Sequence, residues 1–196
     1  MATRPTAQYV QLALLALDAY NRGKNAKIAY DKKDIESSKL ASSIGTAKFE
    51  IDSDQIDGAL ASGFSASSYT LASGQKVISY RGTDFPDFSN PDQTIGFLRD
   101  VILGWVRSMG LAVPGEGSQP YFAQKFYEQI TGKSLFPGAG RDASSPGDII
   151  FTGHSLGGGL AGLVGSRSCT KTHAYDNMPY AAAANENIGN TPENAA

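Results

Sequence analysis

The chain has 196 residues, enough for one hydrophobic core but too few for two, so we expect a single domain over residues 1–196. A formal net charge of −2, with 18% charged residues, gives no electrostatic basis for binding nucleic acid or an anionic membrane surface. The single cysteine, Cys169, excludes an internal disulfide and is expected to be a small buried residue, and no apolar run is long enough to predict a transmembrane helix.

The first predicted element is a helix over residues 7–22. Four of its residues recur at helical spacing and predict its buried face: Val10, Leu14, Leu17 and Tyr20. An amphipathic helix fits this stretch better than a signal peptide, because Asp18 interrupts the apolar run and no small-residue cleavage site follows. The compartment therefore stays open between the cytoplasm and export by a signal that this sequence does not show.

Polar, irregular sequence follows over residues 24–60, with short helices expected near 34–41 and 53–61. Two segments, 68–72 and 76–80, then predict strands, and the short connection between them contains glycine. Two strands joined in this way predict a β-hairpin.

The middle of the chain predicts a loop and two helices. Residues 84–93 contain two prolines and several turn-forming residues, which favours a loop. Residues 94–109 carry a broad apolar stripe and predict a helix. Residues 120–131 predict a second helix, with proline in its first turn.

The last predicted elements form a βαβ unit. Residues 148–152 (DIIFT) are almost uniformly apolar, which is typical of a strand buried on both faces. A tight turn leads to a helix over 156–166, and residues 171–175 predict the next strand. Such a unit places its two strands parallel with a right-handed crossover. The sequence therefore predicts an α/β fold with a mostly parallel sheet and helices on both faces.

The turn of this unit, GHSLG at residues 153–157, fits the pattern G-x-S-x-G. In that pattern the serine lies at a strained corner between a strand and a helix, and the glycines remove side chains that would collide there. Ser155 then lies at a helix N-terminus, where backbone N–H groups favour a developing negative charge. Ser155 is the candidate nucleophile; the alternative is a glycine-rich turn beside an ordinary serine.

A second motif points to the same chemistry. The predicted strand at 76–80 runs into Arg81, Gly82 and Thr83. An oxyanion hole needs one N–H group from the residue after the nucleophile and another from a loop that follows a neighbouring strand. The amides of Leu156 and Thr83 are the candidates, and Gly82 is expected to allow the sharp turn that aims the Thr83 amide inward.

The segments YRGTD and TGHSLGGGLA together resemble the class 3 lipases, the fungal-type triacylglycerol lipases and their bacterial relatives, and the resemblance covers residues 60–180. It implies an α/β-hydrolase fold and hydrolysis of lipid-like esters through an acyl-Ser155 intermediate, without cofactor or metal. The implied partner is a lipid or small ester, with transient contact with a lipid surface. The resemblance also implies a lid within residues 84–109, although ordinary core packing explains the aromatic residues there equally well.

A serine nucleophile needs a general base and a group that orients it. His154 flanks the nucleophile, so its side chain should point away from the hydroxyl, and a structural role is expected. His173 lies inside a predicted strand and is a poor candidate for the base. Asp176 ends that strand and is a candidate for the acid, against the alternative of a turn-forming residue before Asn177.

Two explanations cover the missing base. The chain is the front part of a longer hydrolase, which the ragged sequence after Tyr180 favours, or it is a natural short protein with a degenerate site. Either way, weak or no ester hydrolysis is expected of this polypeptide. The alternatives to a lipase or esterase are a non-catalytic module of the same fold that binds lipid or protein, and a thioesterase or peptidase that shares the nucleophile.

Overall fold

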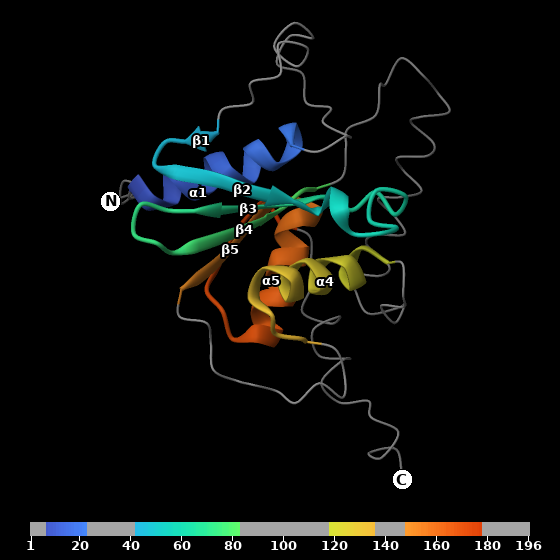
Figure 1. Ribbon diagram of the computed structural model, residues 1–196. Helices are drawn as coiled ribbons and strands as arrows, with labels where there is room; N and C mark the ends of the chain where they lie inside the picture. The colour runs from blue at the N-terminus through green and yellow to red at the C-terminus, as the bar shows by residue number, and fades with distance from the viewer. Residues whose placement is uncertain (1–6, 23–41, 83–117, 136–147, 178–196) are drawn as a thin grey trace, which may run out of the picture.

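The structure, a computed structural model, describes residues 7–22, 42–82, 118–135 and 148–177. In this part of the chain one mixed six-stranded sheet carries helices on both faces (Figure 1). The strands, in their order across the sheet, are β1 (Ser43–Ile44), β2 (Ala47–Asp52), β3 (Ala66–Thr70), β4 (Lys76–Tyr80), β5 (Ile149–His154) and β6 (Thr172–Tyr175).

The direction of the strands changes at β4. The strands from β1 to β4 pair antiparallel, whereas β4, β5 and β6 pair parallel. The prediction of a mostly parallel sheet is therefore wrong for the first half of the sheet and correct for the βαβ part. The physical reason is the length of two connections: the short turns from β1 to β2 and from β3 to β4 can join only antiparallel strands, whereas parallel strands need a long crossover.

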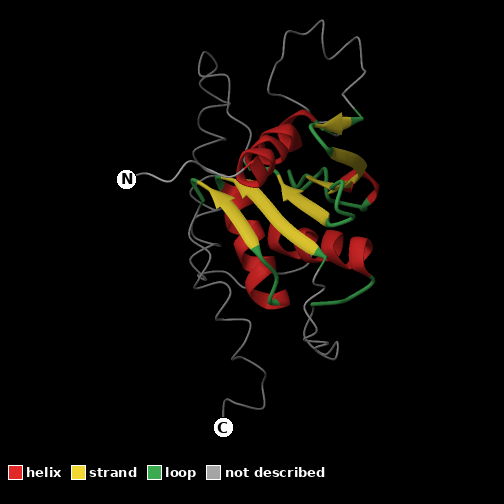
Figure 2. Cartoon of the chain, turned by 90° about the vertical axis from the view of Figure 1, so that its left-hand side faces the viewer, coloured by secondary structure: helices red, strands yellow, loops and turns green. Residues whose placement is uncertain are grey.

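Three α-helices cover the sheet: α1 (Ala7–Asp18), α4 (Gln119–Thr131) and α5 (Leu156–Ser168). Helix α1 lies against β5, β4 and β6 on one face, and α4 and α5 pack against each other on the opposite face. Figure 2 shows the helices on the two sides of the strands. Two single 3₁₀ turns, η1 (Ala19–Asn21) and η2 (Ser53–Gln55), follow α1 and β2. Within the described ranges, no helix is long and apolar enough to cross a bilayer.

The core forms two layers, one on each side of the sheet. The larger layer lies under α4 and α5 and includes Phe64, Tyr80 and Phe151. The smaller layer lies under α1 and includes Leu15 and Ile150. Neighbouring residues of β5 thus enter opposite layers, which confirms the prediction that this strand is buried on both faces.

Helix α1 is present as predicted, but it buries a different face. Leu12 and Leu15 are fully buried, whereas Val10, Leu14 and Leu17 stay 45–48% exposed. Of the four predicted buried residues only Tyr20, in η1, lies in the interior. The helix is apolar almost all round, so two stripes with helical spacing exist, and periodicity alone does not select the one that meets the sheet.

The hairpin of β1 and β2 corrects the prediction of irregular structure over residues 24–60. Residues 47–52 alternate between apolar and charged side chains. The two-residue turn between β1 and β2 holds Gly45 at a φ of 57°, a left-handed conformation that suits glycine. This alternation was a readable strand signal. The helix expected over 53–61 is reduced to η2 followed by turns.

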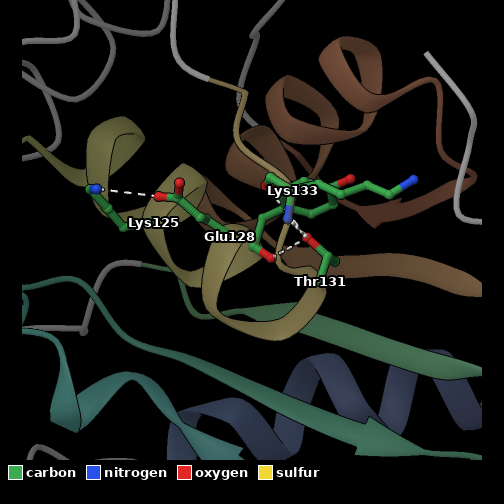
Figure 3. Close-up of polar contacts among 5 residues, drawn as sticks. Lys125, Glu128, Thr131 and Lys133 are labelled. Carbon is green, nitrogen blue, oxygen red and sulfur yellow. Dashed lines mark hydrogen bonds and ion pairs between the residues drawn. The ribbon is translucent and has the colours of Figure 1, made fainter. Parts of the chain in front are cut away.

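The other described elements confirm their predictions within a few residues, including the hairpin of β3 and β4. Helix α4 begins at an N-cap in which the Ser118 hydroxyl accepts from the Tyr121 amide at 3.3 Å. At its other end the Thr131 hydroxyl donates to the Tyr127 carbonyl at 2.8 Å and accepts from the Lys133 amide at 3.0 Å (Figure 3). These local hydrogen bonds explain why this helix begins and ends where the sequence indicates.

Cys169 corrects another prediction. It is exposed and forms the C-cap of α5 with a φ of 53°, so it is not a buried filler. The helices expected over 34–41 and 94–109 and the loop expected over 84–93 lie outside the described residues.

Candidate functional site

The candidate site is the corner between β5 and α5, where Ser155 has a φ of 56° and a ψ of −125°. A side chain in this region of backbone space costs about 1–3 kcal/mol, so the surroundings must impose the conformation. They do so through two backbone hydrogen bonds: the Ser155 amide donates to the Tyr175 carbonyl at 3.0 Å, and the Ser155 carbonyl accepts from the Gly159 amide at 3.2 Å. The predicted strained corner is therefore present.

The two glycines of the motif provide space for this corner. A Cβ atom on Gly153 would overlap the backbone of Gly157 and lie 2.8 Å from the Gly158 nitrogen. A Cβ atom on Gly157 would overlap the Tyr80 carbonyl oxygen and lie 2.7 Å from the Arg81 carbonyl carbon. These contacts confirm the predicted steric reason for both glycines, and they show that the N-terminus of α5 lies directly against the end of β4.

The first turn of α5 supplies N–H groups at the corner. Leu156 is the first residue of the helix, and the amides of a first helical turn have no acceptor within their own helix. The Ser155 side chain does not cap them, and within the described part of the chain no hydrogen bond to its hydroxyl is present. The corner thus places a half-buried hydroxyl beside amides that, together with the helix dipole, favour negative charge.

The end of β4 reaches the same corner. Tyr80 pairs with Gly153, so Arg81 and Gly82 continue along the end of β5. A Cβ atom on Gly82 would lie 2.7 Å from the His154 carbonyl oxygen. Thr83, the candidate for the second oxyanion amide, is the next residue but lies outside the described residues, as does the lid expected over 84–109.

The structure gives a steric reason for glycine at position 82. Gly82 is not among the glycines with positive φ, and the predicted direction of the Thr83 amide lies outside the described residues. Position 82 needs the space, because a Cβ atom there would overlap the hydroxyl of Tyr20. Gly82 therefore makes room for a side chain from the N-terminal part of the chain.

His154 points towards that same tyrosine. Its Nδ1 atom lies 3.0 Å from the Tyr20 hydroxyl oxygen, and the two rings meet edge to face with centroids 6.0 Å apart. Along β5, Ile150, Thr152 and His154 share the face that α1 covers, since Thr152 donates to the carbonyl of Leu12. His154 is therefore held on the side of the sheet opposite α5, as its predicted structural role requires.

His173 lies on the same face as His154. Its ring packs against Tyr9 of α1 with centroids 5.0 Å apart. His173 lies two residues before the end of β6 and pairs with Thr152 of β5. Burial, and secondly the charge of Lys171, lower the pKa of His173 below its usual value of 6.5. The structure thus does not bring this histidine together with Ser155.

Asp176 lies in the turn that follows β6. It comes directly after Tyr175, whose carbonyl oxygen binds the Ser155 amide, so the two candidate residues share one edge of the sheet. Asp176 is exposed and has a φ of 46°. Its position at this edge agrees with either sequence interpretation, acid or turn former.

The sequence interpretation missed Tyr20 as a neighbour of the site and assigned it only to an apolar stripe. Nothing in a single sequence marks a contact between positions 134 residues apart. Within the described ranges, no group of three or more His, Cys, Asp or Glu side chains is placed to hold a metal ion. No known protein-family model matches the chain, and no curated protein sequence matches it.

Proposed function

We propose that this chain is a serine hydrolase of the lipase or esterase type, in which Ser155 attacks the carbonyl carbon of a lipid or small ester. The observation that carries the proposal is the strained backbone of Ser155 at the N-terminus of α5. A non-glycine residue in such a conformation is expensive and is found where function requires it. The same corner is the position of the nucleophile in the G-x-S-x-G pattern.

The arrangement of strands supports an α/β-hydrolase-type fold for this proposal. Ser155 follows the middle one of three parallel strands, with α5 on one face of the sheet and α1 on the other. Ligands of such sheets bind beyond the carboxyl ends of the strands, and Ser155, Asp176 and the end of β4 all lie at that edge. The resemblance to class 3 lipases over residues 60–180 points to the same fold.

In the proposed mechanism the Ser155 oxygen adds to the ester carbonyl, and the carbonyl oxygen becomes negatively charged. The amides of Leu156 and Thr83 stabilise this oxyanion. Collapse of the adduct expels the alcohol, which takes up the proton lost by the serine, and leaves an acyl-Ser155 intermediate that water hydrolyses. Asp176 is the proposed acid of the triad.

A second candidate function is a non-catalytic module of the same fold that binds lipid or a protein partner. The observation that favours it is the placement of the two histidines in the sequence: His154 is held by Tyr20, and His173 packs against Tyr9. Neither is placed to remove the proton of Ser155. Loss of a triad base lowers the rate by several orders of magnitude.

We therefore expect the 196-residue chain to react only slowly with a fluorophosphonate probe at Ser155, and to hydrolyse p-nitrophenyl esters at least about 1,000-fold more slowly than an enzyme with a complete triad. Mass spectrometry of the labelled peptide identifies the site, and Ser155→Ala is the negative control. Ser166→Ala, in the same helix, controls for nonspecific labelling of serine. A folded protein that the probe does not label at Ser155 would favour the non-catalytic module, and rapid turnover abolished by Ser155→Ala would reveal a base.

A further inference from the structure

Tyr20 lies where three segments of the chain meet. It belongs to η1, its hydroxyl lies 3.0 Å from Nδ1 and 3.5 Å from the carbonyl oxygen of His154, and it occupies the space beside Gly82. The ring is almost completely buried, with 2% of its surface exposed. One side chain thus contacts the residue before Ser155 and the residue before Thr83, and these are the two strand ends that the proposed site brings together.

The contact with Gly82 is close enough to be specific. A Cβ atom at position 82 would overlap the Tyr20 hydroxyl and also approach the carbonyl oxygen of His154. With Tyr20 in place, the end of β4 can therefore lie beside the end of β5 only if residue 82 has no side chain. The packing density of protein interiors leaves little room for either strand end to shift while Tyr20 stays in place.

A buried network of hydrogen bonds fixes the residues that flank Tyr20 in the sequence. Asp18, two residues earlier, accepts hydrogen bonds from Arg22 Nε at 2.7 Å and from the Tyr69 hydroxyl at 2.8 Å. The guanidinium of Arg22 lies over the ring of Phe49, 4.4 Å from its centroid. Residues on both sides of η1 are thereby fixed to β2 and β3, so the position of Tyr20 is set before any substrate arrives.

We propose that Tyr20 is a positioning residue for the nucleophile. Its hydroxyl is hydrogen-bonded to Nδ1 of His154, and this bond fixes the end of β5 against the end of β4. Ser155 and its flanking amides are then held against Gly82 at the end of β4. The catalytic part of this inference rests on the proposed hydrolase function, whereas the structural part does not.

The test compares Tyr20→Phe with Ser79→Ala. Both variants remove one buried hydroxyl that joins the N-terminal helical region to the sheet, but Ser79 donates to the carbonyl of Leu15 at 3.0 Å and does not contact His154. We expect Tyr20→Phe to slow fluorophosphonate labelling of Ser155 by about tenfold, because small misplacements of reacting groups have large effects on rate. Ser79→Ala should leave the labelling rate within about twofold of the wild type, since it leaves this geometry intact.

A second readout does not depend on reactivity. In uniformly ¹⁵N-labelled protein, the ring nitrogen signals of His154 report its hydrogen bond to Tyr20, with His173→Gln used for assignment. Tyr20→Phe should shift the Nδ1 signal of His154 and the backbone amide signals of Ser155 and Leu156, and Ser79→Ala should leave these three unchanged. A wild type that the probe does not label would count against the hydrolase function alone, and these spectra would still decide the positioning role.

Two outcomes would overturn the inference: unchanged His154 signals in Tyr20→Phe, or equal losses of labelling in Tyr20→Phe and Ser79→Ala. If Tyr20→Phe does not fold, substitutions of the partner replace it. His154→Asn can keep an acceptor near the position of Nδ1 and should retain labelling, whereas His154→Ala should lose it to the same extent as predicted for Tyr20→Phe. Equal labelling of these two variants would also contradict the inference.

Discussion

Ser155 has a backbone conformation that glycine adopts more easily than any residue with a side chain, and this gives the corner a measurable signature. Ser155→Ala keeps a Cβ atom and therefore keeps the strain, whereas Ser155→Gly removes it. We expect Ser155→Gly to be more stable than Ser155→Ala by about 1 kcal/mol, the strain relief exceeding the larger entropy that glycine loses on folding. Urea unfolding followed by far-UV circular dichroism measures the difference.

The matched control is Ser166, which lies in the regular part of α5 and is exposed. There, Ser166→Gly should be less stable than Ser166→Ala by about 1 kcal/mol, as in other helix interiors. The opposite order of stability at the two serines is the expected result. The same order at both positions would mean that residue 155 does not carry the strain.

At this scale the sequence predicted the features whose causes are local. Gly153, Ser155 and Gly157 could be assigned because the collision between a strand and the helix that follows it involves residues a few positions apart. The reason for Gly82 could not be assigned, because the atom that needs its space belongs to Tyr20 and reaches it only through the tertiary fold. Local steric rules apply to any chain, whereas a contact across the fold requires the fold to be known.

Among the elements, α1 shows what periodicity leaves undecided. The helix presents apolar residues on two faces, and the sheet takes the face with Leu12 and Leu15. The buried face also carries a charged residue, Asp18, which binds Arg22 and Tyr69 there. From the sequence alone, an acidic residue at the end of an apolar helix is expected to be exposed to solvent. Its burial becomes clear only from the structure, which shows its two partners.

This buried network predicts how strongly α1 is fixed to the sheet. Asp18→Asn keeps the shape of the side chain but removes the carboxylate charge that pairs with the buried guanidinium of Arg22 at 2.7 Å. Breaking a buried ion pair from one side costs about 3–5 kcal/mol, and we expect a loss of that size in the free energy of unfolding. Chemical denaturation at pH 7 measures it.

The pair of Lys48 and Glu50 provides the control on the same sheet. Its charged atoms lie 3.7 Å apart and are exposed to solvent, so Glu50→Gln should change the free energy of unfolding by less than about 1 kcal/mol. Combining Asp18→Asn with Arg22→Met should restore part of the lost stability, because both charges of this buried pair are then removed. A loss no larger than that of Glu50→Gln would show that the Asp18 network does not fix the helix.

Across the whole molecule, the sequence predicted the βαβ half of the sheet and the hairpin of β3 and β4, and it missed the hairpin of β1 and β2. A uniformly apolar strand followed by a glycine-rich corner is a strong pattern, and β5 and α5 form as expected. The pattern of the first strands is weaker, because β1 has two residues and β2 is interrupted by a register shift between Phe49 and Ile51. The pairing of β1 with β2, and of β2 with β3, therefore became clear only from the structure.

The two layers of the core each bury a tyrosine, and this predicts a loss of stability at alkaline pH. Burial, and secondly the nearby Asp18 carboxylate, raise the pKa of Tyr69 above its usual value of 10.0, and burial also raises the pKa of Tyr80 well above that value. Both side chains stay protonated in the folded protein while they ionise in the unfolded chain. The unfolded state then binds fewer protons above pH 10, so the stability that is present at lower pH decreases as the pH rises.

Each such tyrosine should lower the free energy of unfolding by about 1.4 kcal/mol per pH unit above pH 10. Urea unfolding at pH 10.5 and pH 11.5 measures the slope, and Tyr69→Phe and Tyr80→Phe should each reduce it by that amount. Comparing slopes cancels the pH-independent loss of the hydrogen bonds from Tyr69 to Asp18 and from Tyr80 to the Ala123 carbonyl. A folded wild type in which the tyrosinate absorbance of these two residues increases near pH 10 would contradict their burial on opposite sides of the sheet.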